Sequence, residues 1–325
     1  MGYFYYQLNF QSPVHFGQSE TGGKLEKAGF EFSADSLFSA ICTELAQQGE
    51  LDLLEKIVDM AKKGELLLSD LFPFMDKDGD EIYYLPRPYL FRSNGSVEKL
   101  DMEQAKVISA QRKVAKKQQY IRASEYGAYI KAMAKGEIYS LQTPLQDFGE
   151  NSLMERVNCR QSEPLPYYVG QYTFAKNAGL YGIVKMPEDF QDRFISILSS
   201  LGLAGIGGKR SSGYGRFTSE LFDLDDIVED TKALLDMLEN SSTATQMNIS
   251  VLKPAADELE NVKEGQYQLK KRSGFTDNTK RDSVYMLASG SCFKKRLNGE
   301  VVDISRDYGH PIWRYGKGLF VGLEI

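Results

Sequence analysis

The sequence predicts an α+β fold, and three observations support this class. Runs of alternating apolar and polar residues are typical of strands, and two longer segments have the apolar spacing of amphipathic helices. When residues 90–166 are set aside, these elements follow one another in the order β-α-β-β-α-β. This is the order of a ferredoxin-like (RRM-like) domain.

The first half of this order lies before residue 90. Residues 5–14 alternate between apolar and polar and predict a strand. Residues 33–49 predict a helix, because the segment begins with capping residues and ends in glycine. Residues 65–90 predict a hairpin around the turn DKDGD.

The second half follows an insertion. Residues 96–140 predict two helices, and residues 141–166 predict an irregular loop or extended arm because they hold few periodic apolar residues. Residues 167–186 then predict two strands around a turn. Residues 187–205 predict a helix that begins with proline, and residues 216–224 predict the last strand.

The C-terminal part differs in character. Residues 225–246 predict a helix and a Ser/Thr-rich linker, and strand-like runs follow to the end of the chain. We therefore expect an RRM-like domain at 1–225, with its insertion at about 90–175, and a smaller β-rich, RRM-like domain at 245–325.

Composition excludes several classes of protein. The net charge of −6 argues against a protein that coats nucleic acid over its whole surface, although it permits a local basic track. Cys42, Cys159 and Cys292 form no pairing pattern, which favours the reducing cytoplasm. With His15 and His310 as the only histidines, a zinc site is not expected. No signal peptide and no membrane-spanning run is predicted.

The basic residues are clustered rather than spread evenly. Between residues 104 and 124 there is no acid. The helix predicted at 104–122 can follow an RNA backbone. Alternatively, its basic side can be an ordinary solvated helix face, which is the commoner case for a charge run. The six basic residues are Lys106, Arg112, Lys113, Lys116, Lys117 and Arg122.

The glycine-rich loop at 205–216 is the most informative segment. It fits neither a Walker loop, because residue 203 is leucine and Arg210 follows Lys209, nor a dinucleotide fingerprint, because it follows a helix. Glycines let backbone amides approach phosphates, the cations supply positive charge, and the serine hydroxyls supply further hydrogen-bond donors. Tyr214 can stack on a base. The alternative, a helix cap and tight turn, explains only one or two glycines. The candidate residues are Gly205, Gly207, Gly208, Lys209, Arg210, Ser211, Ser212, Gly213, Tyr214, Gly215 and Arg216.

Two further segments carry candidate residues. His15 and Phe16 follow the first strand and suggest either base stacking or an acid–base histidine, with a polar loop residue beside a buried phenylalanine as the alternative. An extended arm that suits single-stranded nucleic acid carries Arg156, Arg160, Tyr167, Tyr168 and Tyr172, unless it is a surface hairpin with its tyrosines packed inward.

The C-terminal segment HPIWRYGKGLF gives a third candidate. A core strand with a buried Trp313 is the simpler interpretation. On its other face, Arg314 and Lys317 are expected to be free to contact RNA or a partner.

Three segments together resemble one family: SADSLFSAI (33–41), GIGGKRSSGYGRF (205–217) and HPIWRYGKGLFVGL (310–323). The chain resembles RAMP-superfamily proteins of the type III-A CRISPR effector, the Csm complex, and among them subunit four. The resemblance implies an RRM-like domain with a thumb and a non-catalytic role in antiviral defence. It implies that the chain holds the crRNA 5′ handle and bridges the large palm-domain (Cas ten-type) subunit to the adjacent backbone RAMP subunits.

The resemblance also assigns regions of this chain. The loop at 205–216 would cradle the handle, and the loop at 15–24, which includes Lys24, would line its path. The thumb would fall within about 141–175. No catalytic residue, metal or cofactor is implied.

A second function class remains open. An endoribonuclease of the same superfamily would cut repeat RNA with His15 as its base, helped by Tyr214 or Lys209.

Overall fold

A computed structural model of the chain describes residues 1–17, 25–90, 102–158, 164–224, 227–273, 275–276, 279–280, 283–305 and 309–324. Over 102–117 it describes the whole backbone and part of the side chains. Two of the predicted binding residues, Lys24 and Arg160, therefore lie outside the described residues.

The centre of the molecule is a seven-stranded sheet. Its strands lie in the order β11-β1-β10-β5-β6-β7, with β4 paired to β10, and all pairs are antiparallel. The strands are β1 (Gly2–Phe10), β4 (Leu67–Leu68), β5 (Phe72–Lys77), β6 (Asp80–Pro86), β7 (Tyr120–Arg122), β10 (Ala178–Met186) and β11 (Phe217–Asp223).

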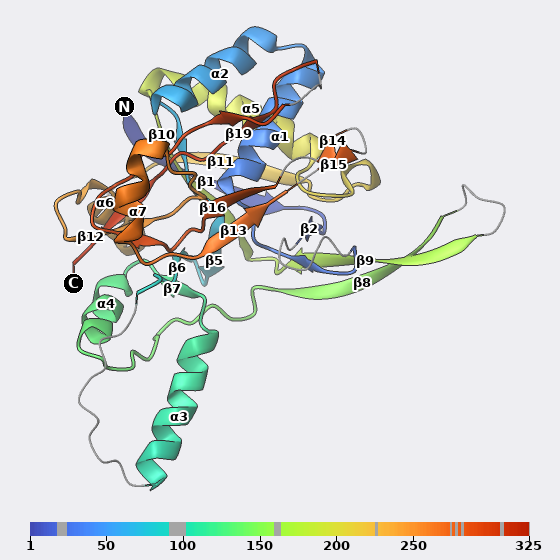
Figure 1. Cartoon of the computed structure of the whole chain (residues 1–325). Helices are drawn as coiled ribbons and strands as arrows, with labels where there is room; N and C mark the ends of the chain where they lie inside the picture. The colour runs from blue at the N-terminus through green and yellow to red at the C-terminus, as the bar shows by residue number, and fades with distance from the viewer. Residues whose placement is uncertain are drawn as a thin grey trace.

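Alternation along β1 divides the core into two layers. Phe4, Tyr6 and Leu8 are buried in one apolar cluster, whereas Tyr5 is buried in the other. The first cluster lies between the sheet and three helices that cover one of its faces (Figure 1). These are α1 (Ala34–Gln48), α2 (Leu51–Lys63) and α5 (Gln191–Ala204), the last preceded by the short turn η2 (Glu188–Phe190).

The main predicted elements of this part are present. The helices expected at 33–49 and 187–205 are α1 and α5, and the expected hairpin is β5–β6. The prediction lacks α2, which ends at Gly64 in the same left-handed conformation that ends α1 at Gly49.

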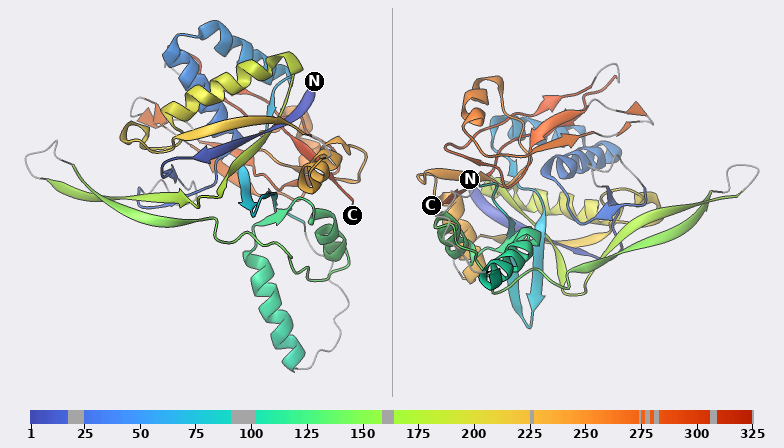
Figure 2. Two further views of the ribbon diagram at one scale, coloured as in Figure 1. Left: turned by 180° about the vertical axis from the view of Figure 1, so that it is seen from behind. Right: turned by 60° about the horizontal axis from the view of Figure 1, so that its bottom comes forward.

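The insertion forms two projections that leave the body in different directions (Figures 1 and 2). One is the helix α3 (Met102–Lys117), and the other is the hairpin of β8 (Gly149–Asn158) and β9 (Leu165–Phe174). The helix α4 (Tyr126–Ala134) packs into the second core cluster. The two predicted helices are confirmed, and of the two alternatives expected at 141–166 the extended arm is observed, because the segment contains β8. Nearly all side chains of β8 are exposed on both faces, so its sequence lacks apolar alternation.

The C-terminal part consists of short strands. A three-stranded sheet has the order β17-β12-β20, and three further pairs are β13–β16, β14–β15 and β18–β19. The pair β2–β3 lies near the N-terminus. The elements are β2 (Phe16–Gly17), β3 (Ala28–Gly29), α6 (Glu229–Glu239), β12 (Thr245–Asn248), η4 (Ala256–Glu258), α7 (Leu259–Lys263), β13 (Leu269–Arg272), β14 (Phe275–Thr276), β15 (Thr279–Lys280), β16 (Val284–Leu287), β17 (Cys292–Phe293), β18 (Val302–Asp303), β19 (Trp313–Arg314) and β20 (Phe320–Leu323).

The C-terminal part shares its core with the rest of the chain. Val251 and Tyr315 belong to the first apolar cluster, and Met247 and Val321 belong to the second. A third, smaller cluster is formed by C-terminal residues alone. In the part of the chain that the structure describes, no helix has both the length and the apolar character of a membrane span.

Candidate nucleic-acid interface

The glycine-rich loop joins α5 to β11 and is folded tightly on itself. Ile206 is buried, and its amide donates a hydrogen bond of 3.0 Å to the carbonyl of Gly215. Between these residues Lys209 adopts the left-handed conformation, with φ of 63°, and the short turn η3 (Arg210–Ser212) follows. Gly213 ends this turn, also in the left-handed region. The tip of the loop therefore has a defined backbone.

The loop is clamped to the segment that follows β1. The amide of Gly208 donates to the carbonyl of His15 at 2.9 Å, and the amide of Gly215 donates to that of Pro13 at 2.9 Å. The amide of Arg216 donates to the Oγ atom of Ser12 at 2.9 Å. These bonds bring 12–17 and 205–216 together as a single surface feature.

Most glycines of the loop are required by packing within the chain. A Cβ at Gly205 would lie 2.5 Å from the carbonyl oxygen of Tyr214, and one at Gly207 would lie 2.6 Å from the ring of Phe16. At Gly208 it would lie 2.7 Å from the ring of His15, and at Gly215 it would overlap the backbone of residue 206. Only Gly213, with φ of 83°, has open space around the added atom.

This packing contradicts one expectation about the glycines. A structural cause was expected to explain one or two glycines, and it explains most of them. Glycine density alone is therefore not evidence for a ligand. What points to a ligand is the chemistry of the tip.

The tip presents cations and unused amides. Lys209 and Arg210 are half-buried, and Ser211, Ser212 and Arg216 are exposed. Within the described part of the chain, the amides of 209–211 donate to no acceptor. A shallow, open hollow lies beside them, lined by Gln47, Ala204, Gly207, Lys209, Arg210 and Ser211. Free amides beside cations are the features that bind a phosphate.

One face of the β8–β9 hairpin approaches this tip. Arg156 and Tyr167 are paired across the two strands, and the ammonium of Lys209 lies 5.3 Å from the centre of the Tyr167 ring. The guanidinium of Arg156 lies 5.3 Å from the ring of Tyr214. The Nε atom of Arg156 is buried and has no hydrogen-bond partner among the residues that the structure describes. The site therefore unites the loop tip with the outer half of the hairpin, near its closing turn.

Tyr214 lies inside this junction. Its ring is only 5% exposed, and its hydroxyl donates to the Oε1 atom of Gln171 at 2.7 Å. The predicted stacking on a base does not fit this burial. Tyr214 instead fastens the loop to β9.

Tyr168 lies on the opposite face of the hairpin. It is paired with Glu155, and strand alternation places it with Leu153 and Val157. Leu153, Val157 and Tyr168 are 61%, 53% and 47% exposed. The structure thus separates Tyr168 from Lys209 and Arg156. The tyrosine that faces the loop is Tyr167, and the alternation of β9 was the sequence signal that could have separated it from Tyr168.

His15 and Phe16 have different environments. The Nδ1 atom of His15 lies 2.7 Å from the carbonyl oxygen of Gly170, which fixes the half-buried ring against β9. Phe16 is 3% exposed, and its ring packs at 4.5 Å from that of Phe32. Phe16 is therefore a core residue, and the alternative of a buried phenylalanine is the one observed.

The C-terminal cations are not on a free surface. Arg314 and Lys317 are 5% and 7% exposed. The Nη1 atom of Arg314 donates to Asp35 at 2.6 Å, and the Nζ atom of Lys317 donates to the carbonyl of Gly299 at 3.0 Å. The expectation that these two residues contact RNA is therefore wrong. Trp313 is half-buried, with Lys62 3.8 Å from the centre of its ring.

Asp35 joins two of the segments that carry the family resemblance. It is fully buried and accepts hydrogen bonds from Arg314 and, at 2.9 Å, from Arg272. Burial alone would raise the pKa of this carboxyl, but the two guanidinium groups hold it below its ordinary value. The segment 33–41 is thus tied to 310–323 by an ion cluster with a structural role.

Metal-ligating side chains do not gather in the described ranges. No group of three or more His, Cys, Asp or Glu residues there is arranged to hold an ion.

Comparison with known proteins identifies the family. Residues 241–323 match the family model described as the CRISPR Csm4 C-terminal domain. Over its full length the chain is 30% identical to the CRISPR system Cms protein Csm4 of Streptococcus thermophilus, covering 100% of both chains. This chain belongs to the Csm4 family. The Csm4 of Mycobacterium tuberculosis strain H37Rv is 29% identical, over 95% of this chain and 94% of its own length.

Solved Csm4 structures share the fold. The match to a crystal structure of a Csm3–Csm4 subcomplex of the type III-A interference complex has a TM-score of 0.63 at 16% identity and covers 100% of both chains. A Csm1–Csm4 cassette in complex with pppApA gives a TM-score of 0.59 at 17% identity, over 99% of this chain and 98% of that chain. The resemblance drawn from the sequence is confirmed.

Proposed function

We propose that this Csm4-family chain is the non-catalytic RNA-binding subunit of a type III-A CRISPR effector complex, where it holds the repeat-derived 5′ handle of the crRNA. One observation carries the proposal: Lys209 and Arg210 stand on a rigid turn whose first amides have no acceptor in the described structure. The guanidinium of Arg156, 5.3 Å from the centre of the Tyr214 ring, adds a third cation beside them. Together they suit the phosphates of a bent RNA segment.

The strand order supports a ferredoxin-like first domain. In the order β11-β1-β10-β5, the first and third strands of the βαββαβ unit are central, and α1 and α5 follow them along the chain. The glycine-rich loop then lies between the second helix and the last strand. We also propose that the chain has two domains, 1–225 and 245–325, although the two parts share two core clusters.

Bridging is the second part of the proposed role. Other Csm4 proteins have been solved with Csm1 and with Csm3, which supports contacts of this chain with a large palm-domain subunit and a backbone subunit. The exposed apolar residues Leu153, Val157 and Tyr168 suit a contact of the hairpin with another macromolecule.

The endoribonuclease alternative finds less support. A cut by general acid–base chemistry needs a second group beside His15. Of the groups considered for that task, the hydroxyl of Tyr214 is buried and donates to Gln171. The ring of His15 is itself held against the carbonyl oxygen of Gly170. Sequence-defined cuts in repeat RNA that His15→Ala abolishes would favour the nuclease.

Replacing the two loop cations tests the binding role. We expect Lys209→Ala with Arg210→Ala to weaken binding of a labelled 5′-handle RNA at least about tenfold, because two phosphate contacts are lost. The salt dependence should fall by about 1.4 in log–log slope. Lys63→Ala with Lys232→Ala removes two exposed charges elsewhere and is the matched control. Unchanged affinity and slope in the loop variant would contradict the proposal.

A further inference from the structure

The helix α3 stands apart from the rest of the molecule. It projects from the body, and no described element packs along its length (Figure 1). Its described attachment is at its end, where the Nη1 atom of Arg87 donates to the carbonyl of Ala115 at 3.2 Å. Most helices in proteins are stabilised by packing, which α3 lacks along its length. Because isolated helices of this length are marginal in water, α3 has little support of its own.

Its lysines have no counter-charge in the described structure. Lys106, Lys113 and Lys117 are exposed, and none forms an ion pair with a described acid. Other exposed lysines do find partners, such as Lys263 with Glu260 at 2.6 Å and Lys294 with Glu264 at 2.8 Å. These three lysines therefore have no acidic partner among the described side chains, in a chain whose net charge is −6.

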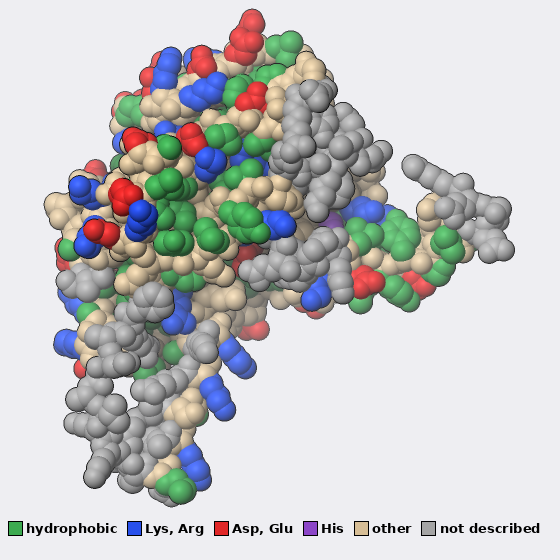
Figure 3. Space-filling model, in the orientation of Figure 1, with side chains coloured by type: hydrophobic (Ala, Val, Ile, Leu, Met, Phe, Trp, Pro, Cys, Tyr) green, Lys and Arg blue, Asp and Glu red, His purple; other side chains and the backbone are tan. Residues whose placement is uncertain are grey.

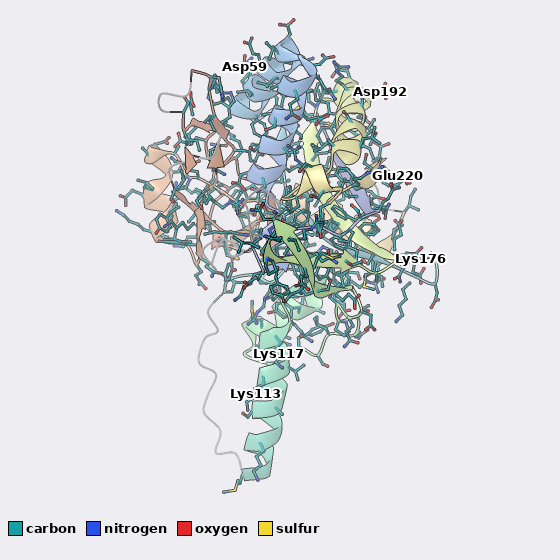
Figure 4. The ribbon with its side chains drawn as sticks, turned by 90° about the vertical axis from the view of Figure 1, so that its right-hand side faces the viewer. Asp59, Lys113, Lys117, Lys176, Asp192 and Glu220 are labelled. Atoms are coloured by element: carbon teal, nitrogen blue, oxygen red, sulfur yellow. The ribbon has the colours of Figure 1, made fainter. Side chains whose placement is uncertain are left out.

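The three lysines form one row. They are separated by seven and four residues, which places them within about 40° of one another around the helix. The rise of the helix spaces them by roughly 10 Å and 6 Å. Figure 3 shows blue side chains along the exposed edge of this projection, and Figure 4 shows Lys113 and Lys117 on it. A straight row of cations suits a linear polyanion better than one compact anion.

The residues between the lysines favour RNA over an acidic protein surface. The same face carries the exposed small residues Ser109 and Ala110. Lysine is depleted at protein–protein interfaces, which are instead rich in aromatic residues and arginine. Lysines are typical of contacts with phosphates, which position a nucleic acid without reading its bases.

We propose that the lysine row of α3 is a second RNA contact, which binds the sugar–phosphate backbone of a strand in a sequence-independent way. This rests on the proposed function in one respect: RNA must be a ligand of this chain. Neutralising the row also removes repulsion between like charges on one helix face. Bound RNA therefore stabilises a helix that the body leaves unsupported.

The test uses the full chain and labelled single-stranded RNAs that extend the 5′ handle with guides of unrelated sequence. We expect Lys106→Ala, Lys113→Ala and Lys117→Ala together to weaken binding at least about fivefold for every guide, and to lower the log–log salt slope by about 2. A triple Lys→Arg variant should bind like the parent. The matched control replaces Lys63, Lys131 and Lys232, three exposed lysines elsewhere in the described structure, by alanine. Alanine is the best helix former, so circular dichroism should show no loss of helix.

Each outcome of this test either supports the inference or contradicts it. Unchanged affinity and slope in the α3 variant, with binding lost in the Lys209/Arg210 variant, overturns this inference and leaves the proposed function standing. Lost binding in the α3 variant alone supports the inference and contradicts the loop as handle site. If RNA binding is unchanged but the α3 variant no longer assembles with a protein subunit, the helix is a protein contact and the inference is wrong.

Discussion

Gly213 and Gly215 lie two residues apart in the same loop, yet their surroundings differ. Both have positive φ, but a Cβ at Gly215 would overlap the backbone of Ile206, whereas at Gly213 it would meet open space. Gly215 is therefore required by the close packing of its backbone against that of Ile206. Gly213 is required only by the left-handed conformation that ends η3.

Alanine at these two positions should therefore have different effects. Gly213→Ala should cost about 1–2 kcal/mol of unfolding free energy, from backbone strain alone. Gly215→Ala should cost at least twice as much, because backbone atoms must also move apart. Urea unfolding measures both values. Equal costs would show that the loop is not packed as described.

At the scale of elements, Asp35 fastens α1 to the C-terminal strands. Its partners Arg272 and Arg314 are themselves largely buried. Removing one partner of a buried ion cluster leaves a buried charge without an opposite charge beside it. This lowers the free energy of unfolding.

We expect Asp35→Asn to lower the unfolding free energy by about 3–5 kcal/mol at pH 7. Because the pKa of Asp35 lies below its ordinary value, the cluster stabilises the fold above pH 4 and this contribution is lost as the pH falls through the folded-state pKa. Unfolding at pH 7 and pH 3 measures the effect. Adding Arg314→Met should recover part of the loss, and an Asp35→Asn variant as stable as the parent would refute the structural role.

Some elements could be predicted from the sequence because they carry their own signal. The spacing of Leu37, Phe38, Ile41 and Leu45 predicts α1, and all four are buried. The helix α2 has a similar pattern and could have been predicted. Strand β8 could not, since it has no apolar face to bury.

The candidate site was less predictable for a physical reason. Burial of Arg314 depends on Asp35, which is 279 residues away in the chain. The glycines similarly depend on Phe16, His15 and Ile206, which no local pattern identifies. Lys209 and Arg210 were recognisable, because their charge is local to the loop.

At the scale of the whole molecule, Asp70 links the N- and C-terminal parts. It is buried, and its Oδ1 atom accepts hydrogen bonds from the amides of Ala34 at 2.7 Å and Val251 at 3.1 Å. Burial raises the pKa of Asp70 to about 6, although the nearby Lys270 opposes the shift.

This raised pKa predicts how stability depends on pH. The folded state keeps the proton of Asp70 longer than the unfolded state, so stability falls as pH rises from about 4 to about 6. Asp70→Asn keeps the acceptor and removes the titration. The difference in unfolding free energy between pH 4.5 and pH 7 should therefore shift by roughly 2 kcal/mol in favour of pH 7, as chemical denaturation would measure. An unaltered pH profile would contradict the assignment.

We claim that a cation-bearing turn at 209–212, together with Arg156 and Tyr167 of the β8–β9 hairpin, holds RNA without cutting it. Photo-crosslinking of a thiouridine-substituted 5′-handle RNA to the full chain, followed by mass spectrometry of the peptides and electrophoresis of the RNA, tests it most directly. We expect crosslinks within 149–158, 164–171 and 205–216, to an RNA of unchanged length. Crosslinks confined to other segments, or a shortened RNA, would contradict it.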